Sequence, residues 1–294
     1  MNQLLQALIN GVMLGGFYAI MVLGFSIIWG VMGVINLAHG EIVMLGAYGA
    51  WILQENLGMD PIFSVVVIFP VMMVFGYLVQ RILINRVIER PHMIALLVTF
   101  GFSIVISNVV KLSYSGTPRS VESSLRGYWD LGGVTVPKTK TGILIAALIV
   151  MLVLHLFLKH SRLGKSIRAA SQNREAARIV GIEIGRVYAI TFAIAIGITA
   201  LAGAMISPTQ AVYPFMGAPL TLRAFTITAL SGLGSIPGAL FGGLAVGVIE
   251  VMLATFVPRV GTNVGIVSSF VLLVIVLVLR PQGLFGGLKP RSPQ

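Results

Sequence analysis

Three polar side chains occur close together in an apolar part of the N-terminal region. Asn36, His39 and Glu41 lie within six residues of one another, among several glycines. A carboxylate at the centre of a bilayer costs about 3 kcal/mol on insertion scales, so Glu41 requires a structural or functional reason. Two interpretations are open. Either Asn36 caps a helix that begins near Glu41, which then lies at a positive helix end, or the three side chains line a path for a solute.

A second polar set follows a helical period. Thr99, Ser103 and Ser107 recur every four residues, which places them on one helix face, and Asn108 comes next. Hydroxyl groups often hold membrane helices together, and lining a pore is the alternative. A third set consists of Thr226, Thr228 and Ser231. It lies in a region rich in proline and glycine, where we expect close backbone packing or a broken helix beside a cavity.

The residues that usually support catalysis are not arranged for it. The four histidines do not follow HExxH or another recurrent metal-binding spacing, GxSxG is absent, and the chain has no cysteine. His39 and Glu41 alone are too few ligands for a metal ion. The glycine-rich run at 231–247 lacks the GxxxxGK[ST] order of a phosphate-binding loop. We therefore expect no catalytic residue, no metal site and no cofactor in this chain.

The composition indicates a membrane protein. Of the 294 residues, 57% are hydrophobic and only 10% are charged, with a mean hydropathy of +0.98. A soluble domain of this size cannot bury so much apolar surface, so we predict an all-α membrane protein in contact with lipid. The net charge of +11 does not indicate nucleic-acid binding, because the basic residues cluster between apolar segments, where the positive-inside rule explains them.

Apolar segments of about 20 residues are expected to cross the roughly 30 Å hydrocarbon core as helices. Nine candidates occur, at residues 4–34, 41–57, 62–79, 93–110, 142–158, 187–206, 220–233, 239–256 and 265–279. We predict a single polytopic helical bundle over residues 1–294, with about 8–10 transmembrane helices. The first segment is long and rich in glycine, so it is either tilted or broken in two. It lacks the features of a cleaved secretory signal, so we expect it in the mature protein.

Residues 159–186 form a basic stretch between two apolar segments, with seven Lys and Arg residues against two acids. Apolar residues recur within it at intervals of three to four, namely Ile167, Ala170, Ala177 and Val180. This period predicts a helix at residues 166–180 that ends at Gly181. Because cytoplasmic linkers are the basic ones, we place residues 159–186 in the cytoplasm.

The alternation of segments extends this orientation to the other linkers. It places the basic linker at residues 81–92 and the C-terminal tail on the same, cytoplasmic side. The polar loop at residues 111–141, with a small hairpin near residues 131–136, then lies outside, and so does the N-terminus.

Three stretches together resemble a known family. They are GVMGVINLAHGEIVMLGAYGAW, SRLGKSIRAASQNREAARIVGI and the ending RPQGLFG. The chain is similar in them to the LivH-type permease subunit of bacterial ABC importers for branched-chain amino acids. The family's central-helix motif corresponds to residues 36–41. Its coupling segment corresponds to residues 164–182, in which we expect coupling roles for Gly164, Arg168, Asn173, Glu175, Ala176, Ala177 and Gly181.

The resemblance implies a type II ABC importer fold in the bacterial plasma (inner) membrane. It also implies the partners: a LivM-type permease subunit, two cytoplasmic ATPase subunits that bind ATP and Mg²⁺, and a periplasmic substrate-binding protein. ATP-driven closure of the ATPases would move the cytoplasmic helix, which would pass the displacement to the spans on either side of it. The solute would then cross by alternating access between the two permeases.

Two other classes of protein remain as alternatives. A secondary transporter driven by protons or sodium would use Glu41, Glu250 and His39 as a relay. Glu250 is an acid inside an apolar segment, and Arg223, Arg259 or a water-filled interior are its candidate neighbours. The third class is a membrane-embedded enzyme or receptor that works without an ATPase. Full-length resemblance in three separate motifs favours the ABC permease over both.

Overall fold

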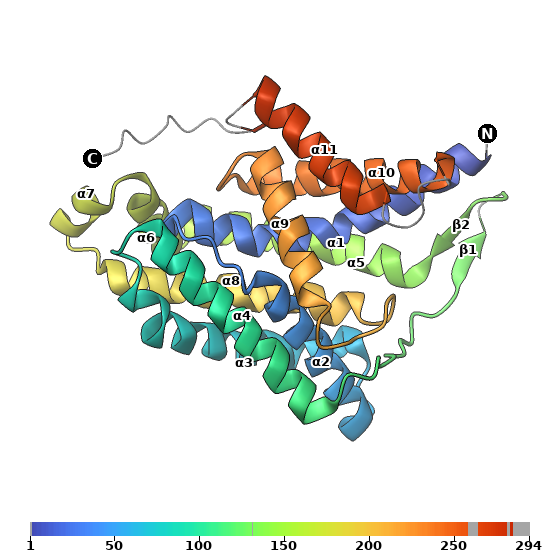
Figure 1. The fold of residues 1–294 in the computed structure, drawn as a ribbon, viewed down its shortest axis with the longest axis horizontal. Coiled ribbons are helices and arrows are strands. Elements are labelled where there is room, and N and C mark those ends of the chain that lie inside the picture. Colours follow the sequence, from blue (N-terminus) through green and yellow to red (C-terminus); the bar gives the residue numbers. More distant parts are fainter. Residues whose placement is uncertain (1, 131, 258–263, 281–282, 285–294) are drawn as a thin grey trace.

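The computed structural model describes residues 2–130, 132–257, 264–280 and 283–284 (Figure 1). In this part of the chain the helices are α1 (Asn2–Met32), α2 (His39–Leu57), α3 (Pro61–Ile82), the 3₁₀ turn η1 (Ile84–Arg86), α4 (His92–Tyr114), α5 (Lys138–His160), α6 (Arg162–Gln172), α7 (Arg174–Ile179), α8 (Ile184–Ile206), α9 (Gly217–Ser231), α10 (Ile236–Phe256) and α11 (Val264–Leu279). A hairpin of β1 (Tyr128–Asp130) and β2 (Thr135–Pro137) interrupts them. The predicted all-α class and the small hairpin are confirmed.

All nine apolar segments are helices, but they differ in length. Six of the described helices, namely α1, α3 with η1, α4, α5, α8 and α10, are long and apolar enough to cross a membrane. With about 1.5 Å of rise per residue, the 15 residues of α9 reach about 22 Å, less than the hydrocarbon core. We therefore describe the bundle as six long helices with three shorter ones, α2, α9 and α11, among them.

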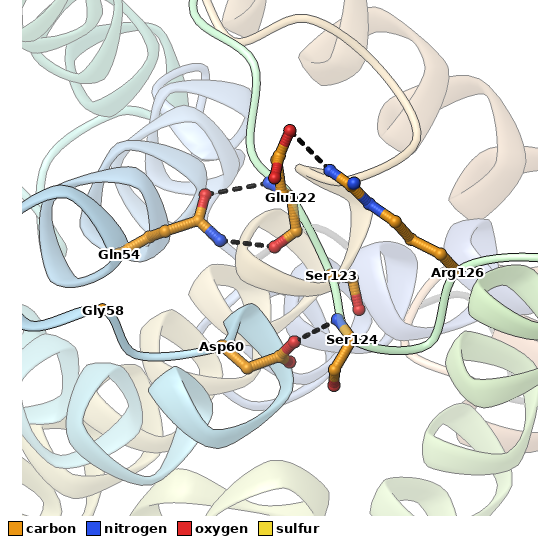
Figure 2. Close-up of a pocket in the computed structure, with 7 residues that line it drawn as sticks. All are labelled: Gln54, Gly58, Asp60, Glu122, Ser123, Ser124 and Arg126. Atoms are coloured by element: carbon orange, nitrogen blue, oxygen red, sulfur yellow. Dashed lines mark hydrogen bonds and ion pairs between the residues drawn. The ribbon is translucent and has the colours of Figure 1, made fainter.

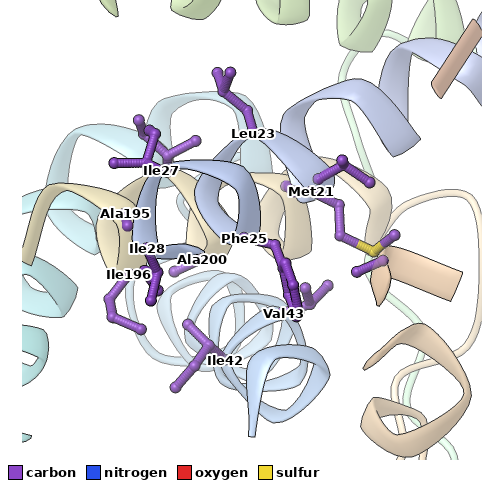
Figure 3. Packing of buried hydrophobic residues seen from close by; sticks show 14 of the residues in the cluster. Met21, Leu23, Phe25, Ile27, Ile28, Ile42, Val43, Ala195, Ile196 and Ala200 are labelled. Carbon is purple, nitrogen blue, oxygen red and sulfur yellow. The ribbon is translucent and has the colours of Figure 1, made fainter. Parts of the chain in front are cut away.

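Helix α1 is the centre of the bundle and runs without a break, which decides between the two forms expected for the first segment. It packs against α10, α8 and α5. Figure 3 shows side chains of α1, α2 and α8 meeting in the core, among them Ile28, Val43 and Ile196. The chain leaves α1 near α6 and returns toward the middle of the bundle before α2 begins (Figure 1).

Glycines bring the helix backbones of this core into direct contact. A Cβ atom at Gly247 of α10 would lie 2.4 Å from the backbone nitrogen of Gly15 of α1. A Cβ atom at Gly46 of α2 would lie 2.0 Å from the carbonyl oxygen of Ala200 of α8. Small residues allow such close packing in membranes, where dispersion contacts hold helices together. The close backbone packing expected for the glycine-rich run at 231–247 is thus confirmed.

The polar linkers gather at the two ends of the bundle (Figure 1). At one end, Glu89 of the linker between α3 and α4 forms ion pairs with Arg174 and Arg178 of α7. The hairpin and the N-terminal end of α1 lie at the opposite end. The two basic linkers therefore share an end, as the alternation of segments predicted. The polar loop is shorter than residues 111–141, because α4 continues to Tyr114 and α5 begins at Lys138.

Candidate functional site

The turn before α2 holds the first of the expected polar residues. Its N-cap is Ala38, which provides no side-chain cap. Asn36 instead accepts a hydrogen bond from the backbone N–H of Ala38 through Oδ1, at 3.1 Å, and one from the N–H of His39 through its carbonyl oxygen, at 3.2 Å. The expected helix cap by Asn36 is corrected in this respect, since its side chain bonds to the N–H of Ala38, before α2 begins, and only its backbone carbonyl reaches the first N–H group of the helix.

The start of α2 meets the start of α9 backbone to backbone. The N–H of Gly40 donates to Oγ1 of Thr221 at 2.7 Å, and a Cβ atom at Gly40 would lie 1.9 Å from the carbonyl oxygen of Gly217. Both helices thus direct their N-terminal ends, which carry partial positive charge, into the same buried region. We call this contact between residues 36–41 and residues 217–221 the polar junction.

Glu41 is the acidic residue of the polar junction and is only 1% exposed. It lies in the first turn of α2, where the helix dipole favours a negative charge. The hydroxyl group of Ser103 lies near it, and Oγ1 of Thr221 lies 3.5 Å from its Oε2. Glu41 has no ion pair among the described residues, so hydroxyl groups and the start of α2 are the polar surroundings of its carboxyl group. The positive-end interpretation of Glu41 agrees with this placement.

The side chain of His39, at the start of α2, contacts α1. Its Nε2 lies 2.9 Å from the carbonyl oxygen of Met21, and its ring stands edge-on to Phe25 with the ring centres 5.1 Å apart. The side chain is fully buried. Among the described residues, no group of three or more His, Cys, Asp or Glu side chains is placed to hold a metal ion.

The four residues of the second polar set do not share one environment, as their spacing predicted. Thr99, Ser103 and Ser107 are buried on one face of α4. The hydroxyl of Thr99 accepts from the N–H of Leu37 at 3.1 Å, so α4 is tied to the turn before α2. Asn108 is exposed and donates to the carbonyl of Ile104 in its own helix, and the structure does not bring it to the polar junction.

The third polar set is buried along α9. Thr228 and Ser231 donate to the carbonyl oxygens four residues earlier, at 2.7 and 2.6 Å. The hydroxyl of Thr226 is buried and has no hydrogen-bond partner among the described residues. These side chains follow the polar junction along α9, toward its C-terminal end. Their role in a path stays a prediction.

The structure shows which of the candidate neighbours of Glu250 is its partner. Arg223 of α9 donates to Oε1 of Glu250 at 2.9 Å, and the hydroxyl of Tyr18 in α1 donates to Oε2 at 2.8 Å. Arg259, the other cation considered, lies outside the described residues. Tyr18 was missed by the sequence analysis, because nothing local distinguishes it from other aromatic residues of the core. The cluster joins α1, α9 and α10.

We expect Glu250→Gln to lower the free energy of unfolding by about 3 kcal/mol, because Arg223 would keep its charge in the interior without a counterion. The side chains are only 22% and 12% exposed, so water screens the pair weakly. Thermal unfolding of the purified protein in detergent measures the effect. Tyr18→Phe is the milder comparison, since it removes one hydrogen bond to a charged group and costs about 2 kcal/mol. Equal unfolding of Glu250→Gln and wild type would contradict the importance of the pair.

The basic stretch at residues 159–186 folds into two helices, so the single helix predicted for residues 166–180 is wrong. The break is at Asn173, whose backbone is extended (φ −151°, ψ 109°) and whose Oδ1 accepts from the N–H groups of Glu175 and Ala176, each at 3.0 Å. Asparagine is a favoured N-cap, and this was the local signal for the second helix. The predicted stop at Gly181 is confirmed by its left-handed backbone (φ 83°).

The other coupling candidates divide between buried and exposed positions. Gly164 packs on α5, where a Cβ atom would lie 2.3 Å from the carbonyl oxygen of Phe157. Ala177 is buried, whereas Arg168, Glu175 and Ala176 are exposed. Of the predicted apolar face, Ile167 and Ala170 are buried as well. Val180 is 75% exposed and Ile179 is 86% exposed, because the break at Asn173 turns α7 away from the bundle.

A polar pocket of about 410 Å³ opens beside the loop between α4 and β1 (Figure 2). The sequence analysis did not predict it. Its lining residues are Gln54, Gly58, Asp60, Glu122, Ser123, Ser124 and Arg126. Gln54 exchanges two hydrogen bonds with the backbone of Glu122, and Asp60 accepts from the N–H of Ser124. These bonds attach the loop to the last turn of α2 and to the segment between α2 and α3.

The attachment through Asp60 should depend on pH. Burial raises the pKa of Asp60, but hydrogen bonds from Ser124 and Ile62 outweigh it and hold the pKa below its ordinary value of 3.8. The ionised group therefore stabilises the loop above the unfolded pKa, and this stabilisation is lost as the pH falls through the lower folded pKa. We expect hydrogen exchange at Ser124, corrected for the intrinsic rate, to accelerate on acidification. In Asp60→Asn this pH dependence should disappear, and its persistence would contradict the assignment.

The sequence was compared with those of known proteins. Residues 7–279 match the family described as branched-chain amino acid transport system / permease component. The chain belongs to this family. The permease is 32% identical to the high-affinity branched-chain amino acid transport system permease protein LivH of Salmonella typhimurium, over 96% of this chain and 95% of LivH. It is 33% identical to BraD of Pseudomonas aeruginosa, named as a permease protein of the same kind of system, with the same two coverages.

Membership of the family confirms the suspected resemblance and the expected class, a polytopic helical permease. The solved structure titled PsaBC from Streptococcus pneumoniae in complex with Fab is also similar to the permease. The TM-score is 0.46 at 14% sequence identity, and the match covers 96% of this chain and 91% of that one.

Proposed function

We propose that the permease is the transmembrane subunit of an ABC importer that carries branched-chain or related amino acids into the cytoplasm. One observation supports this most strongly: similarity over nearly the whole chain to LivH and BraD, both named as branched-chain amino acid transport permeases. The protein acts in transport and not as an enzyme, so the energy must come from partner subunits. We assign ATP and Mg²⁺ to two cytoplasmic ATPase subunits, with no cofactor in this chain.

The end of α7 is the expected contact with an ATPase. Ile179 and Val180 are 86% and 75% exposed at the tip of a polar segment that lies outside the long apolar helices. Neighbouring apolar side chains that project from such a segment are typical of a site where another protein binds. The basic residues of the same segment, Arg162, Lys165, Arg168 and Arg178, favour an apolar groove with an acidic rim.

The sidedness of the permease follows from its charges. We place α6, α7, the linker between α3 and α4, and the C-terminal tail in the cytoplasm, because the basic linkers of membrane proteins stay there. The N-terminus, the hairpin and the pocket around Asp60 then face outward, in a bacterial plasma (inner) membrane. A substrate-binding protein on that side would deliver the amino acid, and a LivM-type permease would complete the passage.

The polar junction is the proposed midpoint of the passage. Two helix N-termini, the carboxylate of Glu41 and the hydroxyls of Thr99, Ser103 and Thr221 converge there, while the surrounding core is apolar. Short helices that end inside a bundle are a common source of polar sites in transporters. In the described structure this region is closed, so passage requires the helices to separate.

The ion-driven alternative finds less support. Glu250 is held by Arg223 and Tyr18, and His39 is held by the backbone of α1, so neither is poised as a link in a relay. The relatives are named as parts of branched-chain amino acid transport systems. An ABC importer therefore explains more of the observations.

Reconstitution of the complete complex in liposomes tests the proposal. We expect ATP hydrolysis and uptake to be stimulated by the binding protein loaded with leucine, isoleucine or valine, and to resist an uncoupler. Urea and short amides serve as competing substrates. Uptake that persists without ATP and collapses with the uncoupler would overturn the proposal in favour of an ion-driven carrier.

A further inference from the structure

We propose that α4 is a second transmission arm, through which Arg174 and Glu89 connect the ATPase contact to the polar junction. This inference rests on the proposed function and extends it, because α7 is joined covalently only to α6 and α8. The connection through α4 combines two non-covalent contacts with the short covalent linker between them. Its three steps follow in order from the cytoplasmic end.

The first contact joins α7 to the linker between α3 and α4. A guanidinium nitrogen of Arg174 donates to Oε1 of Glu89, and a nitrogen of Arg178 lies 3.4 Å from the same oxygen. The guanidinium of Arg174 also lies over the ring of Tyr188 in α8, 5.6 Å from its centre. Arg174 thus holds α7, α8 and the linker together at one point. A bond between ionised groups with this packing orients both partners.

The second step is the linker itself, which is short and internally bonded. The N–H groups of Val87 and Ile88 donate to the carbonyl of Ile84, and that of Arg90 donates to the carbonyl of Val87, each at 3.0 Å. Ile84 is buried in the core and anchors the series. Only two residues separate Glu89 from the first residue of α4, so a displacement of Glu89 must move the beginning of that helix.

The third contact joins α4 to the polar junction. Thr99 lies two turns into α4 and bonds to the N–H of Leu37, while Ser103, one turn further, lies near Glu41. The opposite side of α4 is largely exposed, with Leu97 63% and Ile104 48% accessible. A helix packed on one side can shift as a rod along that side more easily than one enclosed by neighbours. Movement of α7 is therefore passed to the turn from which α2 begins.

The stability of the protein does not require this arm. Glu89 is 65% exposed, and exposed ion pairs contribute little to the free energy of folding. The ion pair of Glu89 matters for transport because it connects elements that are distant in the sequence. Substitution of Glu89 should consequently separate ATP hydrolysis from transport while the complex stays assembled.

The test uses the complete complex, with its ATPases and binding protein, in liposomes. In Glu89→Arg we expect uptake per ATP hydrolysed to fall about fivefold. Basal ATP hydrolysis and the amount of assembled complex should be unchanged. Glu89→Gln, which removes the charge without adding repulsion, should show a smaller loss. The double variant Glu89→Arg with Arg174→Glu restores an ion pair with reversed polarity and should recover most of the uptake.

The outcomes separate the inference from the function on which it rests. Wild-type complex without ATP-driven uptake would refute the proposed function. If the wild type transports normally, then wild-type coupling in both Glu89→Arg and Glu89→Gln would overturn the inference. A loss that the reversed pair does not recover at all would overturn it too, because it would show that Glu89 acts through something other than Arg174.

Discussion

Gly40→Ala is expected to abolish uptake by the reconstituted complex. The added Cβ atom would lie 1.9 Å from the carbonyl oxygen of Gly217 and 2.7 Å from the backbone nitrogen of Thr221. Both neighbours are backbone atoms, so a rotamer change cannot make room, and α2 and α9 would have to separate. Overpacking of this kind costs about 3 kcal/mol or more, and here it would also remove the hydrogen bond from Gly40 to Thr221. ATP-driven uptake and thermal unfolding measure the two consequences.

Gly101→Ala is the matched control for this substitution. Gly101 lies on α4 and a Cβ atom there would meet nothing within 4 Å. The higher helix propensity of alanine should change stability by no more than about 1 kcal/mol and leave uptake unchanged. Normal uptake by Gly40→Ala would show that the junction tolerates separation of the two helices, and the proposed midpoint of the passage would then be wrong.

The second large effect is expected at the tip of α7. Replacing Ile179 and Val180 together by aspartate should weaken binding of the ATPase subunits at least tenfold, about 1.4 kcal/mol, because the apolar contact is lost and like charges meet. Both side chains are exposed in the isolated chain, so the fold and its insertion in the membrane should not change. Co-purification with the ATPases and uptake with the binding protein measure the loss.

Conservative substitutions at the same two positions provide the comparison. Ile179→Leu and Val180→Leu keep the apolar contact area and should retain most of the uptake. Undiminished ATPase binding by the aspartate variant would place the contact elsewhere on residues 159–186. If the aspartate variant binds the ATPases normally but does not transport, the binding contact also lies elsewhere. Ile179 and Val180 would then still have a role in coupling.

The helices and the polar positions within them were predictable from the sequence. Long apolar segments, the hydroxyl period on α4 and the interruption before α2 are all local features, since each depends on residues one or two turns apart. The break at Asn173 was missed because the apolar period of residues 166–180 continues across it. The period describes which face is apolar, whereas the capping side chain decides where the backbone leaves the helix.

The burial of residues that follow that break illustrates the same limit. Ala177 was predicted on the apolar face and is buried, while Val180, three residues later, is exposed. The residue type alone would place valine inside more readily than alanine. The direction in which α7 leaves α6 determines the result, and the extended backbone of Asn173 between the two helices sets that direction.

The sequence by itself determined that this is a membrane-embedded helical permease, which residues carry its polar groups, and which linkers are basic. Only the tertiary structure decided which of these groups meet. Glu250 lies 27 residues from Arg223 and 232 residues from Tyr18, and Gly40 is 181 residues from Thr221. Hydropathy and helical period act between near neighbours in the chain, whereas such pairs form only where helices cross, and the crossing is set by backbone packing at glycines that any apolar segment could contain.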